Sequence, residues 1–429
     1  MNLFLKTSEN KHFIEHHHYY YNEVALEEDF PIIPKPILFL QDEKAVCFEV
    51  NVNTRKIQTN YYIGVDWIIE GSKAIYVEPK LNNNSTQQTN YLKMLFSALE
   101  HDDLAIYTID LFEIKWDSAT IEIEQHQDLL TPLLVVQYLR LVKQIVRKGL
   151  KKSYYKIINN LYAKVKGKVL TSQTIKQNLI KNKPLNTYCS YDEFGFNGLE
   201  NRLLKKAMVF IQSYLPNIKN LQSEKYMNEV FNYINPAFEF VSEEVNLHDI
   251  KHSKTNAFYK EYEEAIKLAK LILKRFGYNI SNTKEEKIKI PPFWIDMSKL
   301  FELYVLGLLK EQFKNQVIYH PTYNSKELDF LLLSPPMVID AKYKPRYLYT
   351  SVLDDARQLS GYSRMHKVYD ALKYPKDKII DCLIIYPNQE SNNKDFSKFS
   401  ELIKHSNSTI GEYVNFYKIA IELPVVNEI

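Results

Sequence analysis

Two apolar runs on either side of Ser334-Pro335-Pro336 constrain the fold of this chain more than any other feature. Residues 330–333 and 337–339 are rich in strand-forming side chains, and the serine–proline segment between them is a typical turn sequence. We therefore predict a β-hairpin. A turn made by Ser334-Pro335, or by all three turn residues, sets Asp329 opposite Asp340 or its immediate neighbour. Opposed residues have Cβ atoms roughly 5 Å apart, which allows two carboxylates to share one divalent cation.

The residues around Asp340 indicate the chemistry of such a site. Side chains alternate along a strand, so Asp340 and Lys342 point to the same face. Carboxylates suit Mg²⁺, or Mn²⁺ in its place, and a neighbouring lysine can orient water or stabilise charge on a scissile phosphate. The spacing D-x(10)-D-x-K is that of the PD-(D/E)xK nuclease superfamily, with Asp329 as the first acid. A solvated surface hairpin is the alternative, but the apolar runs favour a buried site.

Helical patterns lie on both sides of the predicted hairpin. The apolar stripe before it carries Glu302 at its edge, where we expect the carboxylate to reach the metal site, with a solvated helical carboxylate as the alternative. The helix predicted for residues 354–362 places Gln358 and Tyr362 on one face. Helix, hairpin, helix and strand in this order predict an α/β nuclease core over residues 286–429.

A basic region precedes this core. The formal net charge is only +3, yet residues 129–191 hold thirteen Lys or Arg and no Asp or Glu. A segment whose charges are all positive repels itself unless a polyanion is near. The phosphate backbone of a nucleic acid is the natural partner. A solvated helix face is the alternative. Apolar residues at helical spacing predict that residues 129–285 form a mainly helical, DNA-contacting or linking region.

Residues 1–128 contain many short strand-like runs and one helix-like run at 91–99, so we predict a β-rich docking domain. The fold class expected for the whole chain is α/β, more strictly a multidomain α+β protein. The three cysteines are far apart, and no apolar run is long enough to span a bilayer, which favours a cytoplasmic protein without membrane contact. No G-x-x-x-x-G-K-[ST] occurs in the 429 residues, so we expect no nucleotide to bind through a P-loop.

Ordered matches over some three hundred residues resemble the McrC family, the nuclease subunit of McrBC-type modification-dependent restriction systems. The matches include Tyr62-Ile63-Gly64-Val65, Val77-Glu78-Pro79-Lys80-Leu81, Gly167-Lys168-Val169-Leu170, Tyr191-Asp192-Glu193-Phe194, Leu199–Lys205, Met297–Glu302, Leu328-Asp329, Ile339–Lys344 and Asp355-x-x-Gln358-Leu359-x-x-Tyr362.

The resemblance implies a Mg²⁺-dependent endonuclease subunit that cleaves modified double-stranded DNA. It also implies a partner, a McrB-like AAA+ GTPase hexamer, which recognises the DNA and whose GTPase this subunit stimulates. Asp329 and Asp340 would bind the metal, with the Ala341 carbonyl as a further ligand, and Lys342 would activate water. Glu302 and Gln358 would support the site. Lys164, Lys166, Lys168, Lys344 and Tyr362 are the predicted DNA contacts.

Three points stay open at the level of sequence. Glu327 lies two residues before Asp329 and is the alternative first acid, since no proline precedes Asp329 as it often does in the superfamily. A catalytically silent adaptor that only activates a AAA+ motor would retain the same fold. A stand-alone defence nuclease would share the same site without needing the motor.

Overall fold

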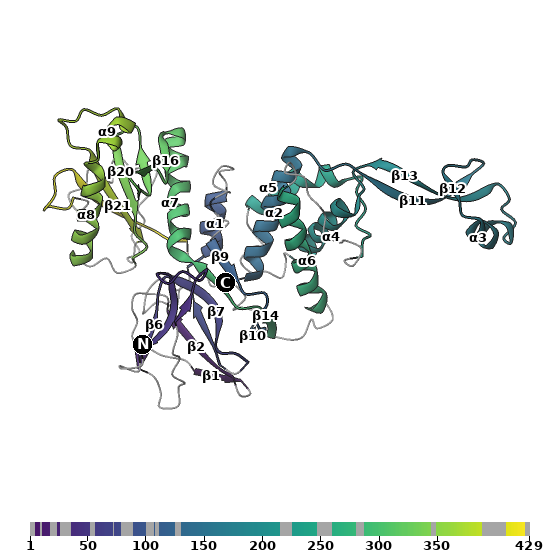
Figure 1. Cartoon of the computed structure of the whole chain (residues 1–429), viewed down its shortest axis with the longest axis horizontal. Coiled ribbons are helices and arrows are strands. Elements are labelled where there is room, and N and C mark those ends of the chain that lie inside the picture. The colour runs from purple at the N-terminus through teal and green to yellow at the C-terminus, as the bar shows by residue number, and fades with distance from the viewer. Residues whose placement is uncertain are drawn as a thin grey trace. The chain divides into compact units, whose positions relative to one another are not determined.

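The computed structural model of the chain describes residues 5–8, 11–17, 24–25, 36–51, 56–71, 73–78, 89–99, 107, 111–124, 130–214, 225–246, 260–279, 287–344, 349–387 and 409–424. The chain divides into two compact units (Figure 1). Residues 1–128 and 287–429 form the first, and residues 129–286 form the second. The sequence predicts three domains, at residues 1–128, 129–285 and 286–429, and this division stays a prediction. The first of the two units contains both ends of the chain.

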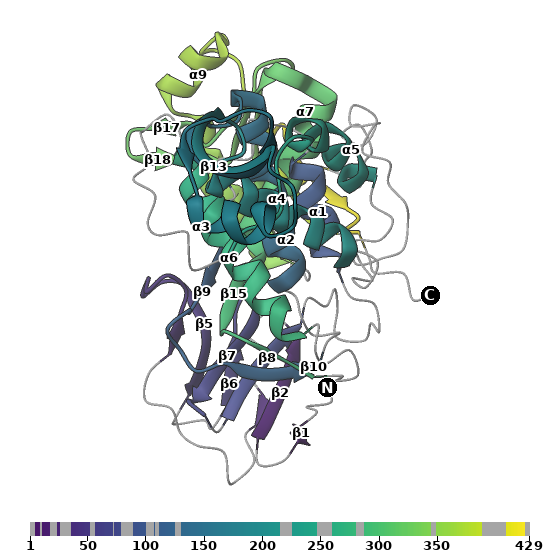
Figure 2. The same ribbon diagram turned by 90° about the vertical axis from the view of Figure 1, so that its right-hand side faces the viewer.

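A six-stranded sheet in the first unit joins strands from distant parts of the chain (Figure 2). Its central strand β7, Tyr62–Ile69, is rich in aromatic and β-branched residues, which favour strands. The order across the sheet is β1 (Leu5–Ser8), β2 (Lys11–His17), β8 (Lys73–Glu78), β7, β15 (Phe293–Asp296) and β9 (Phe112–Ile114).

A second, four-stranded sheet packs with the first around a shared core. Phe48 of the second sheet, Val77 of β8 and Trp294 of β15 belong to one cluster of buried side chains. The first part of the chain is therefore rich in strands, as predicted. The second sheet has the order β3 (Val24–Ala25), β6 (Lys56–Thr59), β5 (Val46–Asn51) and β4 (Ile37–Leu38), and β10 (Ile121–Glu124) pairs separately with β14 (Lys287–Ile290).

Strand β15 leads directly into helix α7, Met297–Phe313. Asp296 ends the strand and caps the helix, because its Oδ1 accepts a hydrogen bond from the backbone N–H of Lys299 at 3.0 Å. Helix α1, Tyr91–Leu99, packs against α7. At the contact, a Cβ on Gly307 would lie 3.1 Å from the carbonyl oxygen of Ser97, so the glycine permits the close approach.

The C-terminal part of the first unit is a five-stranded sheet with the predicted hairpin at its centre. Strands β19 (Phe330–Leu332) and β20 (Met337–Ala341) pair antiparallel, and β20 continues the sheet in parallel with β21 (Asp381–Pro387). Helix α8, Tyr349–Ser363, packs on β20 and β21. The remaining elements are β16 (Val317–Tyr319), β22 (Phe416–Ile421), the small hairpin β17–β18 (Thr322–Tyr323 and Lys326–Glu327), α9 (His366–Leu372) and the 3₁₀ turn η9 (Lys314–Gln316).

Side-chain alternation assigns the two faces of this sheet. Val338 and Leu331 belong to the core cluster that contains Ala356 and Leu359 of α8. The next residue along β20, Ile339, points to the other face, as does Tyr343, whose ring lies 5.5 Å from that of Phe301 of α7. Helices α8 and α7 therefore cover opposite faces (Figure 1).

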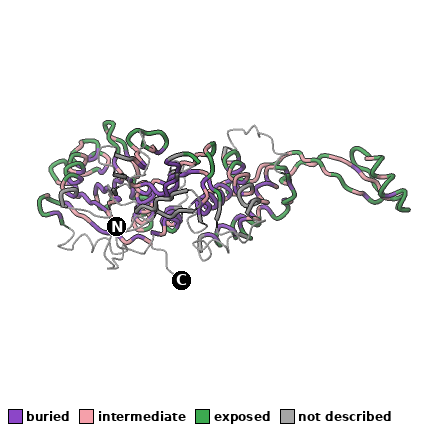
Figure 3. The backbone as a smooth tube through the Cα atoms, turned by 90° about the horizontal axis from the view of Figure 1, so that it is seen from below, coloured by how far each residue is buried: buried purple, intermediate pink, exposed green. Residues whose placement is uncertain are grey.

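The second unit combines a helical core with a long β-hairpin. Figure 3 shows buried residues in the helices and mostly intermediate or exposed residues along the hairpin. The helices are α2 (Leu130–Lys148), α4 (Leu199–Tyr214), α5 (Lys225–Ile234) and α6 (Lys260–Asn279), with the 3₁₀ turn η5 (Asn235–Phe238). The hairpin consists of β11 (Ser153–Tyr162) and β13 (Asn186–Gly195), with β12 (Lys168–Val169), α3 (Thr171–Thr174) and the π-turn η3 (Ile175–Leu179) between them.

The expectation of a mainly helical basic region is therefore wrong for β11 and β13, although the segment between them contains the short helical turns α3 and η3. Ser153–Tyr162 and Asn186–Gly195 pair antiparallel over their whole length. Both runs are rich in tyrosine, with three in the first and two in the second, which favours strands over helices, and neither run has an apolar stripe at helical spacing. Among the described helices, none is both long and apolar enough to cross a membrane.

A substitution at Gly64 tests whether the close approach of β7 and β15 is required for stability. A Cβ at this position would lie 2.1 Å from the carbonyl oxygen of Phe293, and the backbone φ of +151° already disfavours other residues. We expect Gly64→Ala to lower the free energy of unfolding by more than about 2 kcal/mol, measured by urea denaturation.

The control for this substitution is Gly361→Ala. Gly361 lies within α8, and a Cβ there would meet no atom within 4 Å among the described residues. Alanine should raise the free energy of unfolding by about 0.5–1 kcal/mol, as expected for a helix interior. Equal effects of the two substitutions would contradict the close strand contact.

Candidate active site

The hairpin register sets two aspartates side by side at its open end. Phe330 pairs with Ile339 and Leu331 with Val338, so the next pair in the same register is Asp329 with Asp340. This is the arrangement predicted from a turn centred on Ser334-Pro335. Asp340 is 5% exposed, and Asp329 Oδ2 accepts a hydrogen bond from the backbone N–H of Ala341 at 2.8 Å. That bond fixes the first acid against the strand that carries the second.

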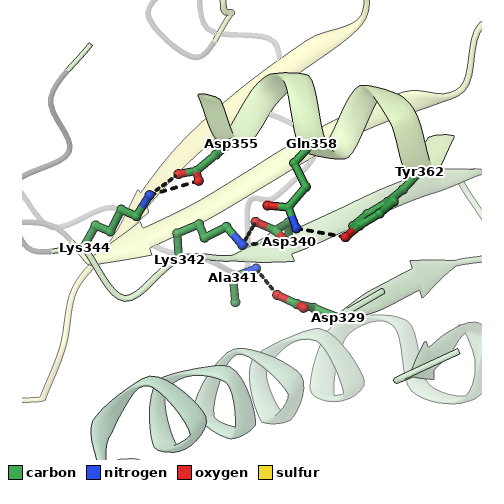
Figure 4. Close-up of polar contacts among 8 residues, drawn as sticks. All are labelled: Asp329, Asp340, Ala341, Lys342, Lys344, Asp355, Gln358 and Tyr362. Carbon is green, nitrogen blue, oxygen red and sulfur yellow. Dashed lines mark hydrogen bonds and ion pairs between the residues drawn. The ribbon is translucent and has the colours of Figure 1, made fainter. Parts of the chain in front are cut away.

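Lys342 completes this group on the same face (Figure 4). Its Nζ donates a hydrogen bond to Asp340 Oδ1 at 3.0 Å and lies 2.9 Å from Oδ2. Its backbone N–H donates to the carbonyl oxygen of Ile385 at 2.8 Å, so the sheet holds the lysine beyond the end of β20. The structure thus brings together the two acids and the lysine that the sequence pattern singled out.

Burial makes the two carboxylates costly to ionise. Desolvation, followed by the charges of Asp340 and Glu302, raises the pKa of Asp329 well above its usual range. Desolvation also raises the pKa of Asp340, although Lys342 opposes the change. Burial alone would lower the pKa of Lys342, but Asp340 and Asp329 outweigh burial and raise it, so the lysine is held as a cation. The cluster therefore favours binding of a further positive charge.

The same group meets the requirements of a Mg²⁺ site. Asp340 Oδ2 is buried and lies 2.9 Å from the Lys342 ammonium, and a carboxylate oxygen with one such contact keeps a lone pair that can bind a metal. The residues that the structure describes contain no group of three or more His, Cys, Asp or Glu arranged to hold a metal. Mg²⁺ needs no such cage, because it usually binds one or two carboxylates and keeps several waters or phosphate oxygens.

Glu302 lies on α7, on the opposite side of the sheet from α8, and has a partner that sequence analysis did not find. Its Oε1 is in contact with Nε2 of His320, whose Nδ1 lies 2.6 Å from Glu327. His320 also donates its backbone N–H to the carbonyl oxygen of Asp329 at 3.0 Å. The metal role of Glu302 stays a prediction. Glu327, the alternative first acid, is bound to His320, whereas Asp329 is the acid held opposite Asp340.

Gln358 and Tyr362 share one face of α8, as predicted. Gln358 Nε2 donates a hydrogen bond to the Tyr362 hydroxyl at 2.9 Å, and Figure 4 shows the Gln358 amide directed toward Asp340 and Lys342. Beside them, Lys344 is in contact with Asp355, a buried residue to which sequence analysis assigned no role. The only sequence signal for Asp355 is its place in the motif that includes Gln358.

The three lysines predicted to contact DNA in the basic region lie on the hairpin of the second unit. Lys164, Lys166 and Lys168 are all exposed. Lys166 Nζ forms an ion pair with Glu193 at 2.7 Å and lies 4.1 Å from the centre of the Tyr191 ring. Their predicted role in DNA binding stays a prediction.

The raised pKa of Asp329 predicts that ionisation of this carboxyl group lowers the free energy of unfolding. A carboxylate with a higher pKa in the folded than in the unfolded chain reduces stability as the pH rises from its unfolded pKa to its folded pKa. We expect Asp329→Asn, which keeps an oxygen to accept from Ala341, to raise the free energy of unfolding by at least about 1 kcal/mol at pH 7. The measurement is urea denaturation of the metal-free protein in EDTA.

An exposed aspartate provides the matched control. The side chain of Asp370 is 63% exposed and pairs with Lys376, so Asp370→Asn should change the same free energy by less than about 0.5 kcal/mol. A clear loss of stability in Asp329→Asn would contradict the destabilised state of this carboxylate.

Comparisons with known proteins give the family of the chain. No curated protein matches it. Two solved structures are similar: the half-complex from the tetradecameric assembly of Thermococcus gammatolerans McrB AAA+ hexamers with bound McrC (15% identity, 96% of this chain and 94% of that chain, TM-score 0.39) and the Thermococcus gammatolerans McrBC complex (13% identity, 82% and 99%, TM-score 0.29). The model of the McrBC 5-methylcytosine restriction system component family matches residues 57–387, which is most of the chain. This chain therefore belongs to the McrBC 5-methylcytosine restriction system component family.

Proposed function

We propose that this protein is the Mg²⁺-dependent endonuclease subunit of a McrBC-like, GTP-dependent restriction complex that cleaves modified foreign DNA. The observation that carries the proposal is the buried pair Asp329 and Asp340, opposed in one hairpin with Lys342 on the same face. The family membership agrees with it. The reaction is hydrolysis of a phosphodiester bond in double-stranded DNA.

The residues of the site have separate tasks in this reaction. Asp329 and Asp340 hold the metal, with the Ala341 carbonyl as a further candidate ligand. Mg²⁺, or Mn²⁺, supplies positive charge that stabilises the scissile phosphate and lowers the pKa of water. Lys342 orients the attacking water or stabilises the developing negative charge, since its ammonium already lies at the carboxylate edge. Gln358 adds an amide beside this group, and the Tyr362 hydroxyl accepts a hydrogen bond from it.

The proposal includes a partner that supplies energy. The sequence has no P-loop motif, whereas a restriction complex that moves along DNA needs a nucleotide-driven motor. A McrB-like AAA+ GTPase hexamer would recognise the modified DNA, and this subunit would stimulate its GTPase. The strand-rich first part of the chain is the candidate docking region.

The direct test is cleavage of methylated and unmethylated plasmid by the purified protein together with a McrB-like AAA+ GTPase from the same organism. Reactions run with and without GTP and Mg²⁺. We expect cutting only with both proteins, GTP, Mg²⁺ and methylated DNA. Cutting by this chain alone would replace the proposal with a stand-alone nuclease.

Substitution of Asp340 separates the nuclease from an adaptor that only activates the motor. Asp340→Asn should lower the cleavage rate by more than about 100-fold, because it removes a metal ligand, while the protein still stimulates the partner GTPase. Asp370→Asn, on the exposed surface, should cut at the wild-type rate. Unchanged cleavage by Asp340→Asn would refute the assigned site. GTPase stimulation by a wild-type protein that never cuts would favour the adaptor.

A further inference from the structure

A second lysine–aspartate pair lies beside the proposed catalytic group. Lys344 Nζ donates to both carboxylate oxygens of Asp355, at 2.9 Å and 2.7 Å, and only 10% of the Asp355 side chain is exposed. The preceding residue on the same helix, Asp354, also pairs with a cation, Arg357, but both of those side chains are exposed to solvent: 72% for Asp354 and 68% for Arg357. The Lys344 side chain is 23% exposed, so neighbouring positions of α8 carry one largely buried and one exposed ion pair.

Burial of an ion pair is a poor way to gain stability. The desolvation of both charges offsets most of their attraction, and apolar side chains of similar size often stabilise a protein equally well. A surface pair such as Asp354 with Arg357 costs little and contributes little. The buried Asp355 and the half-buried Lys344 that pairs with it therefore indicate a role other than stability, and the geometry around them indicates which one.

The pair joins the strand end that carries Lys342 to the helix that carries Gln358. On the strand side, the backbone N–H of Lys344 donates to the carbonyl oxygen of Lys342 at 2.8 Å, so the two lysines move together. On the helix side, Asp355 lies three residues before Gln358, close to one helical turn, and thus on a neighbouring part of the same face. Figure 4 shows the pair and the Gln358–Tyr362 contact on either side of Asp340 and Lys342.

The pair also affects the electrostatics of the site. Asp355 is near enough for its charge to act on both Asp340 and Lys342. Because Lys344 occupies both oxygens of Asp355, this carboxylate does not compete with Asp340 for the ammonium of Lys342.

We propose that Lys344 and Asp355 are a positioning pair, which holds the Gln358 and Tyr362 face of α8 against Asp340 and Lys342. Lys344 then does not serve as a DNA contact, in contrast to the prediction from sequence. The proposal rests on the nuclease function proposed above for its effect on catalysis, but the positioning of α8 is a property of the chain itself.

The test uses the full chain and single substitutions on both sides of the pair. Asp355→Asn and Lys344→Met each remove one charge, and Asp354→Asn removes the exposed carboxylate next in sequence as the matched control. In the complete reaction, with the partner GTPase, GTP, Mg²⁺ and saturating methylated DNA, we expect each of the first two to lower the turnover number by about tenfold or more, because a displaced group costs that much in a positioned site. The DNA concentration for half-maximal rate should change by less than about twofold, and Asp354→Asn should match the wild type.

Two further variants show that the two residues act together. The double variant Lys344→Met, Asp355→Asn should be no slower than the slower single variant, since partners in one interaction are not additive. Lys344→Arg should keep the turnover number within about threefold of the wild type, because a guanidinium can pair with both oxygens of Asp355.

A direct contact between Lys344 and DNA predicts a different pattern. Lys344→Met would then raise the DNA concentration for half-maximal rate and reduce the salt dependence of binding by about one phosphate contact. Asp355→Asn, which frees the lysine, would leave binding unchanged or tighten it. Opposite effects of these two substitutions would overturn the proposal.

Hydrogen exchange separates a failure of this proposal from a failure of the proposed function. Amide exchange is measured by mass spectrometry on the chain alone, without metal, DNA or motor. We expect exchange in residues 355–363 of α8 to be about tenfold faster in Asp355→Asn and Lys344→Met than in the wild type or Asp354→Asn. If the wild type never cuts, the nuclease proposal fails and the exchange result alone decides on positioning. Unchanged exchange in both variants overturns the proposal, as does faster exchange with an unchanged turnover number.

Discussion

The pairing of β15 with β7 and β9 is the contact on which the first unit depends. Phe293–Asp296 pairs antiparallel with Tyr62–Val65 on one side and, through its first three residues, with Phe112–Ile114 on the other. Inside this sheet, Trp294 Nε1 donates to the buried carboxylate of Asp66, which also binds Lys115 at 2.6 Å. A strand that follows the whole second unit in sequence thus completes a sheet that began before it. The strands that flank the second unit in sequence, β10 before it and β14 after it, pair with each other.

The same strand connects that sheet to the candidate site. Asp296 is both the last residue of β15 and the cap of α7, so little freedom remains between the sheet and the helix. Helix α7 in turn packs on the face of the C-terminal sheet that carries Tyr343, the residue between Lys342 and Lys344. Tyr343 also contacts Tyr61, next to the start of β7, with ring centres 6.1 Å apart. The backbone that presents Lys342 therefore packs, through Tyr343, against Tyr61 beside the N-terminal sheet.

Local pattern was enough to predict the elements that carry the site, but not their distant partners. The apolar stripe of α7 and the Ser334-Pro335 turn each lie within a short window, and the hairpin register follows from them. The β11–β13 hairpin was missed because few of its side chains are buried, which leaves no clean alternation of apolar and polar residues. The roles of His320 and Asp355 depend on residues 18 and 11 positions away, and no local periodicity records such contacts.

The charges on the α8 face of the hairpin explain why the site would suit both a metal and DNA. Asp329, Asp340 and Asp355 carry three negative charges when ionised, and Lys342 and Lys344 carry two positive ones, so the five residues leave a formal charge of −1. A small negative surplus in a buried setting attracts a divalent cation. With that cation bound, the negative surplus of the group would be cancelled, so the group would no longer repel the phosphate of a DNA backbone. Without the two lysines, three carboxylates would hold the cation but repel the phosphate, so the lysines are as necessary to the proposed chemistry as the acids.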